Sequence, residues 1–294
     1  MTYRQTRLAP TPSGFLHLGN VLSFSVTAFL AERTGARTLL RIDDMDRDRV
    51  RPEYIQDIFD TLRFLDIPFD EGPGDLSVFE SSFSQMHRQA WYEAALIQLR
   101  NANSVFACTC SRSQLAAESK DGLYPGTCRH KNIALDTPDV AWRIFTDDRL
   151  ITIKDISGKQ ITQRLPADMR DFIVRKRDGY PAYQLSSLVD DLHWNIDLIV
   201  RGQDLLHSTI AQLFLAEMLN EKSFAGIHFY HHPLLTSSDG QKFSKSAGDT
   251  SVRFLKDQGK TATEIFSIAG EMFGVTGVRD WRMLGEAVVE GGKV

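Results

Sequence analysis

The first 65 residues alternate between strand-like and helix-like patterns. Residues 3–9 and 38–42 are predicted as short strands, and a helical pattern follows each of them. Gly35 ends the first helical pattern, and Pro52 begins the second. Strands separated by helices are typical of a parallel sheet with crossover helices. We therefore expect an α/β fold of the Rossmann type, in which a parallel sheet is doubly wound by helices.

The pattern changes between residues 105 and 182, where cysteines, short β-like runs and turns replace the alternation. We expect an insertion there, and predict four segments. Residues 1–79 form the first half of the Rossmann domain, 80–175 an inserted acceptor-type subdomain, 176–235 the second half, and 236–294 a loop with a short helical tail. With 42% hydrophobic residues the chain can bury a core, and its net charge of −4 requires that any nucleic acid be bound by a local basic patch.

The beginning of the sequence lacks the apolar segment of a signal peptide, and no apolar run approaches the ~18 residues of a membrane span. We therefore expect a cytoplasmic protein without membrane partners. In a reducing compartment, the cluster Cys108, Cys110 and Cys128 favours a metal site over disulfides. Zn²⁺ takes sulfur ligands with nitrogen or oxygen as the fourth, and Tyr124 and His130 are both candidates for that position.

Two short motifs indicate a nucleotide site. The first, His17-Leu18-Gly19-Asn20, separates the first strand from the first helix, and the free N–H groups of a helix N-terminus bind phosphates. The second, Lys242-Phe243-Ser244-Lys245-Ser246, places two lysines in a loop. Alone, the first motif is equally well explained as a surface turn with a capping histidine, and the second is better explained as a solvated basic loop. Together, in this order and about 220 residues apart, they are far less expected by chance.

These motifs resemble the HIGH and KMSKS signatures of class I aminoacyl-tRNA synthetases. Residues from about 4 to 250 resemble the glutamyl-tRNA synthetase group through RLAPTPSG, LLRIDDMDRDR and the run from DFIVRKRDG to RGQDLLHST. The resemblance implies activation of glutamate by ATP with Mg²⁺. It implies that His17, Lys242 and Lys245 are catalytic. It also implies that ATP is contacted by His17, Gly19, Asn20, Lys242, Ser244 and Lys245. Asn20 is a departure, because it replaces the final histidine of HIGH.

Glutamate carries two carboxylates and one ammonium group, so its pocket needs two cations and one anion. Arg7 and Arg201 lie on predicted strands and suit carboxylates, while Asp43 suits the ammonium group. The resemblance assigns glutamate binding to Arg7, Ala9, Thr11, Asp43, Tyr183 and Arg201. Asp43 departs from the glutamate enzymes, which usually carry Glu there, and matches glutaminyl relatives. Because RLAPTPSG resembles the glutamate type, we expect glutamate as the substrate.

The Cys-x-Cys…Tyr-x₃-Cys pattern resembles that of shortened relatives called glutamyl-queuosine tRNA(Asp) synthetases. The resemblance implies a structural zinc held by Cys108, Cys110, Tyr124 and Cys128, and transfer of glutamate to queuosine in tRNA(Asp) by a monomer. Only 48 residues follow Ser246, so we expect no anticodon-binding domain. Two alternatives remain: a glutamyl- or glutaminyl-tRNA synthetase catalytic fragment that works with a separate anticodon-reading partner, and a non-catalytic tRNA-binding paralogue.

Overall fold

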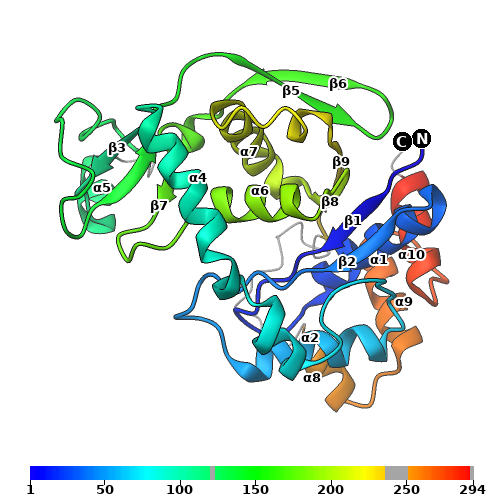
Figure 1. Ribbon diagram of the computed structural model, residues 1–294. Helices are drawn as coiled ribbons and strands as arrows, with labels where there is room; N and C mark the ends of the chain where they lie inside the picture. Colours follow the sequence, from blue (N-terminus) through cyan, green and yellow to red (C-terminus); the bar gives the residue numbers. More distant parts are fainter. Residues whose placement is uncertain (120–122, 236–250, 292–294) are drawn as a thin grey trace. The chain divides into compact units, whose positions relative to one another are not determined.

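The computed structural model describes residues 1–119, 123–235 and 251–291, and the chain forms two compact units (Figure 1). The first unit comprises Met1–His87, Ile196–Asp204 and Phe229–Val294, and the second comprises Arg88–Asn195 and Leu205–His228. Each unit is therefore assembled from segments that are far apart in the sequence.

The first unit contains the parallel strand pair that the sequence predicts. Strand β1 (Gln5–Leu8) pairs in parallel with β2 (Arg37–Leu40), in a register that runs from Gln5 opposite Arg37 to Leu8 opposite Leu40. Helix α1 (Leu18–Thr34) connects them and ends at Gly35, whose φ of 76° is easy only for glycine. Strand β8 (Leu198–Gly202) contacts β1 and is hydrogen-bonded to β9 (His228–His232).

Helices complete the first unit: α2 (Pro52–Phe64), α3 (Leu76–Val78), α8 (Val252–Asp257), α9 (Ala262–Met272) and α10 (Trp281–Gly291). Helix α10 packs closely on α1, because Gly285 offers no side chain where Phe29 and the carbonyl of Ser25 approach. The ion pairs Arg33–Glu290 and Arg282–Glu32 join the same two helices. Helix α10 therefore covers α1, and the predicted division at residue 236 stays a prediction.

The second unit is built on antiparallel strands. Strands β3 (Val105–Cys108), β4 (Ala141–Ile144) and β7 (Ile173–Arg175) form one antiparallel sheet, and β5 (Leu150–Asp155) and β6 (Gln160–Arg164) form a hairpin. The helices of this unit are α4 (Gln89–Asn101), α5 (Arg112–Glu118), α6 (Tyr183–His193) and α7 (Leu206–Met218). A buried ion pair between Arg88 and Asp190 (2.8 Å), to which Tyr92 also donates, joins the start of α4 to α6.

Short turns of helix lie between these elements. They are a π-turn at Phe79–Phe83 and 3₁₀ turns at Gln85–Arg88, Ala167–Met169, Gln203–Leu205 and Phe224–Gly226.

The α/β class is confirmed, but the expectation of a doubly wound parallel sheet holds only in part, because the strands are mixed. Strands β5 and β6 are joined by the tight turn at Gly158 with φ 83°, and a tight turn can join only antiparallel neighbours. Strand β4 is also antiparallel to both of its partners, β3 and β7. The predicted segment boundaries at 79, 175 and 235 stay a prediction.

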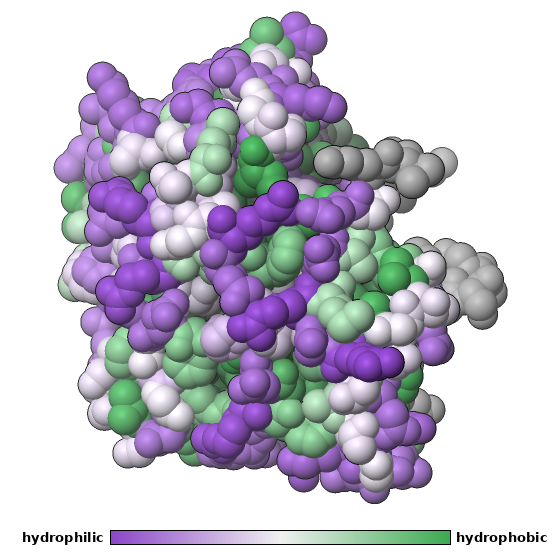
Figure 2. Space-filling model, turned by 90° about the vertical axis from the view of Figure 1, so that its right-hand side faces the viewer, coloured by the Kyte–Doolittle hydropathy of each residue, from purple (hydrophilic) through white to green (hydrophobic). Residues whose placement is uncertain are grey.

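One face of the molecule is drawn in Figure 2, where hydrophilic residues alternate with small, scattered apolar patches. Across the described ranges, no helix is both long enough and apolar enough to cross a membrane.

Candidate active site and metal site

The first nucleotide motif forms the N-terminus of α1. His17 is the N-cap residue: its Nδ1 accepts a hydrogen bond from the Gly19 backbone N–H (3.0 Å), and its own N–H donates to Asn20 Oδ1 (3.0 Å). Because Nδ1 is the acceptor, the neutral imidazole carries its proton on Nε2. The cap thus leaves His17 in the tautomer that can donate a hydrogen bond to a phosphate oxygen.

Gly19 and Asn20 of this motif are both needed for the cap that His17 forms. A Cβ atom at Gly19 would lie 2.8 Å from Cε1 of His17, so only glycine leaves the ring in its capping position. Asn20, which departs from the HIGH signature, completes the reciprocal cap instead of serving only as a ligand for phosphate.

Lys242, Ser244 and Lys245 of the second motif lie outside the described residues. The residues just after this motif are described, and they return to the first one. Ser251 forms an antiparallel bridge with His17, and the Val252 N–H donates to the Leu16 carbonyl (2.8 Å). The chain that follows the lysine motif is therefore attached to the histidine motif.

Two predicted carboxylate ligands, Arg7 and Arg201, are buried in the first unit, at 4% and 3% exposure. Arg7 lies on β1, and its Nη1 donates to the carbonyl of Val200 on β8 (3.3 Å). Arg201 lies on β8, with its guanidinium 5.9 Å from the Phe229 ring centroid. Both arginines thus occur at the neighbouring strands β1 and β8, as a site for two carboxylates requires.

Asp43 is also buried in the first unit, but it has a partner that the sequence analysis missed. Arg41 donates to both of its carboxylate oxygens, at 2.8 and 3.0 Å. The backbone of both residues extends the parallel pairing beyond β2, through bonds from Arg41 N to Leu8 O and from Asp43 N to Pro10 O. The expected anion is thus bound bidentately by a buried cation, a geometry that only the fold reveals.

The other proposed glutamate ligands are distributed over the two units. Ala9 is half-buried and Thr11 is exposed in the loop after β1, both in the first unit. Tyr183 begins α6 in the second unit, and its side chain is 40% exposed. The part of Tyr183 in glutamate binding stays a prediction.

His232 is a further polar residue that sequence reasoning missed. It ends β9, is 3% exposed, and its Nδ1 lies 2.8 Å from the Pro233 carbonyl. Its ring lies beside Gly202 at the end of β8, where Cε1 would be 3.6 Å from an added Cβ. Burial lowers the pKa of His232, so the buried ring is neutral near pH 7. A lone histidine outside any motif gave no signal in the sequence.

The cysteine cluster lies entirely in the second unit. The sulfur atoms of Cys108, Cys110 and Cys128 all lie within 4.8 Å of one another, with Cys110 and Cys128 at 3.5 Å. The Tyr124 hydroxyl accepts a hydrogen bond from the Cys128 backbone N–H at 2.9 Å, whereas His130 is exposed and is not part of the cluster. The donor set therefore fits a tetrahedral zinc ion with three thiolates, and of the two candidates for the fourth ligand it favours Tyr124.

The surroundings of the cluster are aromatic and cationic. Phe106, Tyr124 and Phe145 pack against it, and the Arg143 guanidinium lies 3.7 Å from the Tyr124 ring centroid. Burial raises the pKa of Cys110 to about 12. For Cys128, burial acts in the same direction, but hydrogen bonds from Thr109 and Cys110 outweigh it and lower the pKa to about 7. The Cys128 thiol therefore loses its proton more readily than that of Cys110.

The basic run at residues 175–177 is largely engaged within the second unit. Lys176 pairs with Asp178 (3.0 Å), Arg177 pairs with Asp139 (3.4 Å), and the Arg175 guanidinium lies 5.0 Å from the Trp142 ring centroid. This run therefore serves the fold, and it gives no specific sign of an RNA-binding surface.

Comparison with known proteins assigns the family. Residues 4–279 match the model for tRNA synthetases class I (E and Q), catalytic domain. The chain belongs to this family. Similar curated members are the glutamyl-Q tRNA(Asp) synthetases of Neisseria meningitidis serogroup B and Thiobacillus denitrificans. The first is 36% identical over 81% of this chain and 79% of its own length, and the second is 37% identical over 87% and 81%.

Solved structures agree on the fold of this class I synthetase domain. The glutamate–tRNA synthetase of Elizabethkingia anophelis matches with a TM-score of 0.69 at 24% identity, over 84% of this chain. The chain spans about half of that protein, 53% of its length. The likeness is therefore one of catalytic fold.

Proposed function

We propose that this protein activates L-glutamate with ATP and transfers the glutamyl group to the queuosine base of tRNA(Asp). The observation that carries the proposal is the similarity to glutamyl-Q tRNA(Asp) synthetases, which extends over about four-fifths of both chains. The geometry of the first unit supports it, because the histidine motif caps α1 and two buried arginines occupy the neighbouring strands β1 and β8.

In the first step, an oxygen of the glutamate α-carboxylate attacks the α-phosphorus of ATP. A new P–O bond forms, the bond to the β-phosphate oxygen breaks, and pyrophosphate leaves. The carboxylate is already ionised at neutral pH, so this step needs no general base. His17, protonated on Nε2, donates to a phosphate oxygen, and we assign the same role to Lys242 and Lys245. Mg²⁺ bound with ATP supplies further charge neutralisation.

In the proposed pocket, Arg7 and Arg201 bind the two carboxylates of glutamate and orient the attacking oxygen. Asp43 binds the ammonium group. Further contacts come from Ala9, Thr11 and Tyr183. In the second step, a hydroxyl of queuosine attacks the carbonyl carbon of glutamyl-adenylate. The C–O bond to phosphate breaks, AMP leaves, and the hydroxyl proton is released. Positioning contributes most of the catalysis, because the adenylate is already reactive.

The cysteine cluster has a separate, structural role in this proposal. Cys108, Cys110, Cys128 and Tyr124 would hold one zinc ion, which ties the end of β3 to the loop that carries Tyr124 and Cys128. These residues belong to the second unit, whereas the histidine motif and both arginines belong to the first. Zinc therefore acts on the folding of the second unit.

Glutamate-dependent exchange of label between pyrophosphate and ATP tests the first step. Transfer of labelled glutamate to tRNA(Asp) with and without queuosine tests the second, and removal of the 3′-terminal adenosine of the tRNA distinguishes the site of attachment. Labelling that requires queuosine and persists on tRNA without its terminal adenosine supports the proposal. Labelling that is independent of queuosine would instead indicate a glutamyl-tRNA synthetase, and absence of exchange would indicate a non-catalytic paralogue. The expected monomer is tested separately by light scattering.

A further inference from the structure

Leu16, the residue before His17, is held on both sides by elements from distant parts of the sequence. Its backbone N–H donates to Asp57 Oδ2 on α2 (2.9 Å), and its carbonyl accepts from the Val252 N–H at the start of α8 (2.8 Å). The next residue, His17, is also bridged to Ser251. Two helices thus fix the peptide groups that lead directly into the N-cap of α1.

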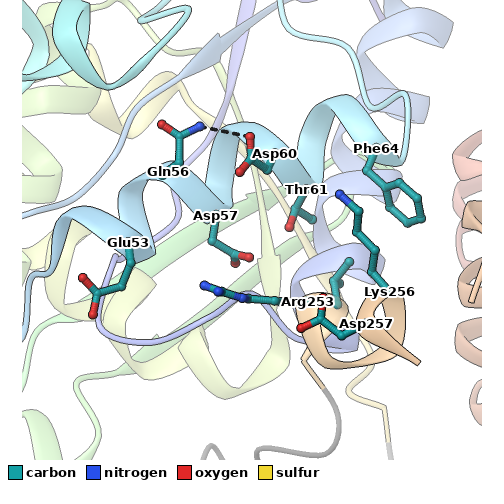
Figure 3. A pocket seen from close by; sticks show the side chains of 10 residues that line it. Glu53, Gln56, Asp57, Asp60, Thr61, Phe64, Arg253, Lys256 and Asp257 are labelled. Carbon is teal, nitrogen blue, oxygen red and sulfur yellow. Dashed lines mark hydrogen bonds between the residues drawn. The ribbon is translucent and has the colours of Figure 1, made fainter. Parts of the chain in front are cut away.

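The two helices face each other across a pocket that Figure 3 shows from close by. Asp57 points from α2 toward Arg253 of α8, and Arg253 in turn lies over the Phe15 ring, 4.6 Å from its centroid. Within the described ranges no cation lies close enough to Asp57, within 4.0 Å, for an ion pair. Asp57 is 6% exposed, and its carboxylate accepts a hydrogen bond from the amide of Leu16.

A buried carboxylate in this place is costly. Burial raises the pKa of Asp57, against the opposing effects of the Leu16 amide and the charges of Arg253 and Lys256. An apolar residue would pack on α2 without this cost, but it would leave the Leu16 N–H without its acceptor. What Asp57 supplies, and an apolar residue would not, is a fixed acceptor for the backbone of the nucleotide motif.

We propose that Asp57 is a positioning residue for the nucleotide site: by holding Leu16 it sets where the His17 imidazole meets ATP. The inference rests on the proposed function, since it takes His17 as a phosphate ligand. Asp57 itself does not touch the substrate in this role. Its loss shifts the peptide before the N-cap, and a displacement of about 1 Å in such a site typically costs about 10²-fold in rate.

Asp57→Ala, Asp57→Asn and the matched control Asp60→Ala are compared by glutamate-dependent ATP–pyrophosphate exchange. Asp60 lies on the same helix beside the same pocket, and among the described residues its carboxylate bonds side chains of α2, Gln56 and Arg63, and no backbone group of the nucleotide motif. We expect Asp57→Ala to lower the exchange rate by about 10- to 100-fold and raise KM for ATP, with KM for glutamate unchanged. Asp57→Asn, which still offers an acceptor oxygen, should stay close to the wild type, as should Asp60→Ala.

Hydrogen exchange gives a measurement that does not depend on activity. The peptide containing Leu16 should exchange faster in Asp57→Ala and not in Asp60→Ala. If Asp57→Ala does not fold, Asp57→Leu fills the space of the carboxylate without accepting a hydrogen bond.

A double mutant with His17→Ala tests whether Asp57 acts through the position of the His17 imidazole. Asp57→Ala should add little to the loss already caused by His17→Ala, because both changes remove the same contact. Fully additive losses, or a folded Asp57→Ala protein that exchanges label at the wild-type rate, would overturn the inference. A wild-type protein without glutamate-dependent exchange would overturn the proposed function instead, while hydrogen exchange would still report on the Asp57–Leu16 bond.

Discussion

Replacement of Gly19 by alanine should separate the stability of α1 from the activity of the nucleotide site. The added methyl group would lie 2.8 Å from Cε1 and 2.9 Å from Nδ1 of His17. Carbon atoms in contact are separated by about 3.5 Å or more, so the ring must move by at least about 0.7 Å. That movement breaks the hydrogen bond between Gly19 N–H and Nδ1 and carries Nε2 away from its position.

The two effects of this substitution on stability oppose each other. Loss of an N-cap hydrogen bond costs about 0.5–2 kcal/mol, whereas alanine is favoured over glycine within a helix by up to about 1 kcal/mol. The net change in the free energy of unfolding is therefore expected within about 1 kcal/mol, or about 2–4 °C in Tm. By contrast, loss of one donor to a developing phosphate charge costs about 2–4 kcal/mol of transition-state stabilisation, about 10²- to 10³-fold in rate.

Glutamate-dependent ATP–pyrophosphate exchange and thermal unfolding, measured on the same preparations, test this reasoning. Gly14→Ala is the matched control, because a Cβ at position 14 meets no atom within 4 Å. We expect a large loss of exchange with a nearly unchanged Tm for Gly19→Ala, and little change in either for Gly14→Ala. A Gly19→Ala protein with the wild-type exchange rate would show that the ring position is irrelevant, and would refute the role given to His17.

Three further predictions concern stability. Cys110→Ser should abolish binding of about one zinc ion per chain and lower Tm while glutamate activation persists; metal analysis that finds no stoichiometric zinc in the wild type would refute the site. Gly285→Ala places a methyl group 2.4 Å from Phe29 Cβ and should cost about 1–3 kcal/mol of unfolding free energy in denaturant titrations. Burial lowers the pKa of His232, so as pH falls below about 6.5 this histidine is protonated in the unfolded chain before it is protonated in the folded protein. The free energy of unfolding should therefore decline there by up to about 1.4 kcal/mol per pH unit. His232→Gln should remove that part of the pH dependence.

The sequence predicted best those elements whose ends carry their own signals. Pro52 begins α2 and Gly35 ends α1, as expected, because proline lacks the N–H that a helix start leaves unbonded and glycine adopts a positive φ without strain. Short β-like runs were expected between residues 105 and 182, and strand β5 at Leu150–Asp155 is one of them. Its antiparallel partner was not predicted, since β6 consists largely of exposed polar residues and lacks an apolar alternation.

Long-range pairs were beyond the reach of sequence patterns. The bond from Leu16 to Asp57 spans 41 residues, and neither Asp57 nor His232 stands in a recognised motif. Arg41 lies in LLRIDDMDRDR, but the motif does not show that its side chain binds Asp43. Local periodicity places Asp57 on a helix, but which neighbour its carboxylate meets depends on how α2 packs. The cysteines were found because three thiols within 21 residues carry a chemical signal of their own.

The pair between Arg41 and Asp43 changes how the Asp43 departure bears on the substrate. Read from the sequence, an aspartate in place of glutamate lengthens the contact to the substrate ammonium group and points toward glutamine. In the structure Arg41, which is buried two residues before Asp43, donates to both oxygens of this carboxylate. The length of the acidic side chain at position 43 must therefore fit Arg41 as well as a ligand. A carboxylate whose length is matched to Arg41 is no longer a direct sign of a glutamine substrate. In the proposed pocket Arg7 and Arg201 each face a carboxylate, of which glutamate offers two and glutamine only one. Binding glutamine would leave a buried guanidinium facing a neutral amide, at a cost of about 1.5–3 kcal/mol for a lost charged hydrogen bond, so the charge of the proposed pocket favours glutamate despite Asp43.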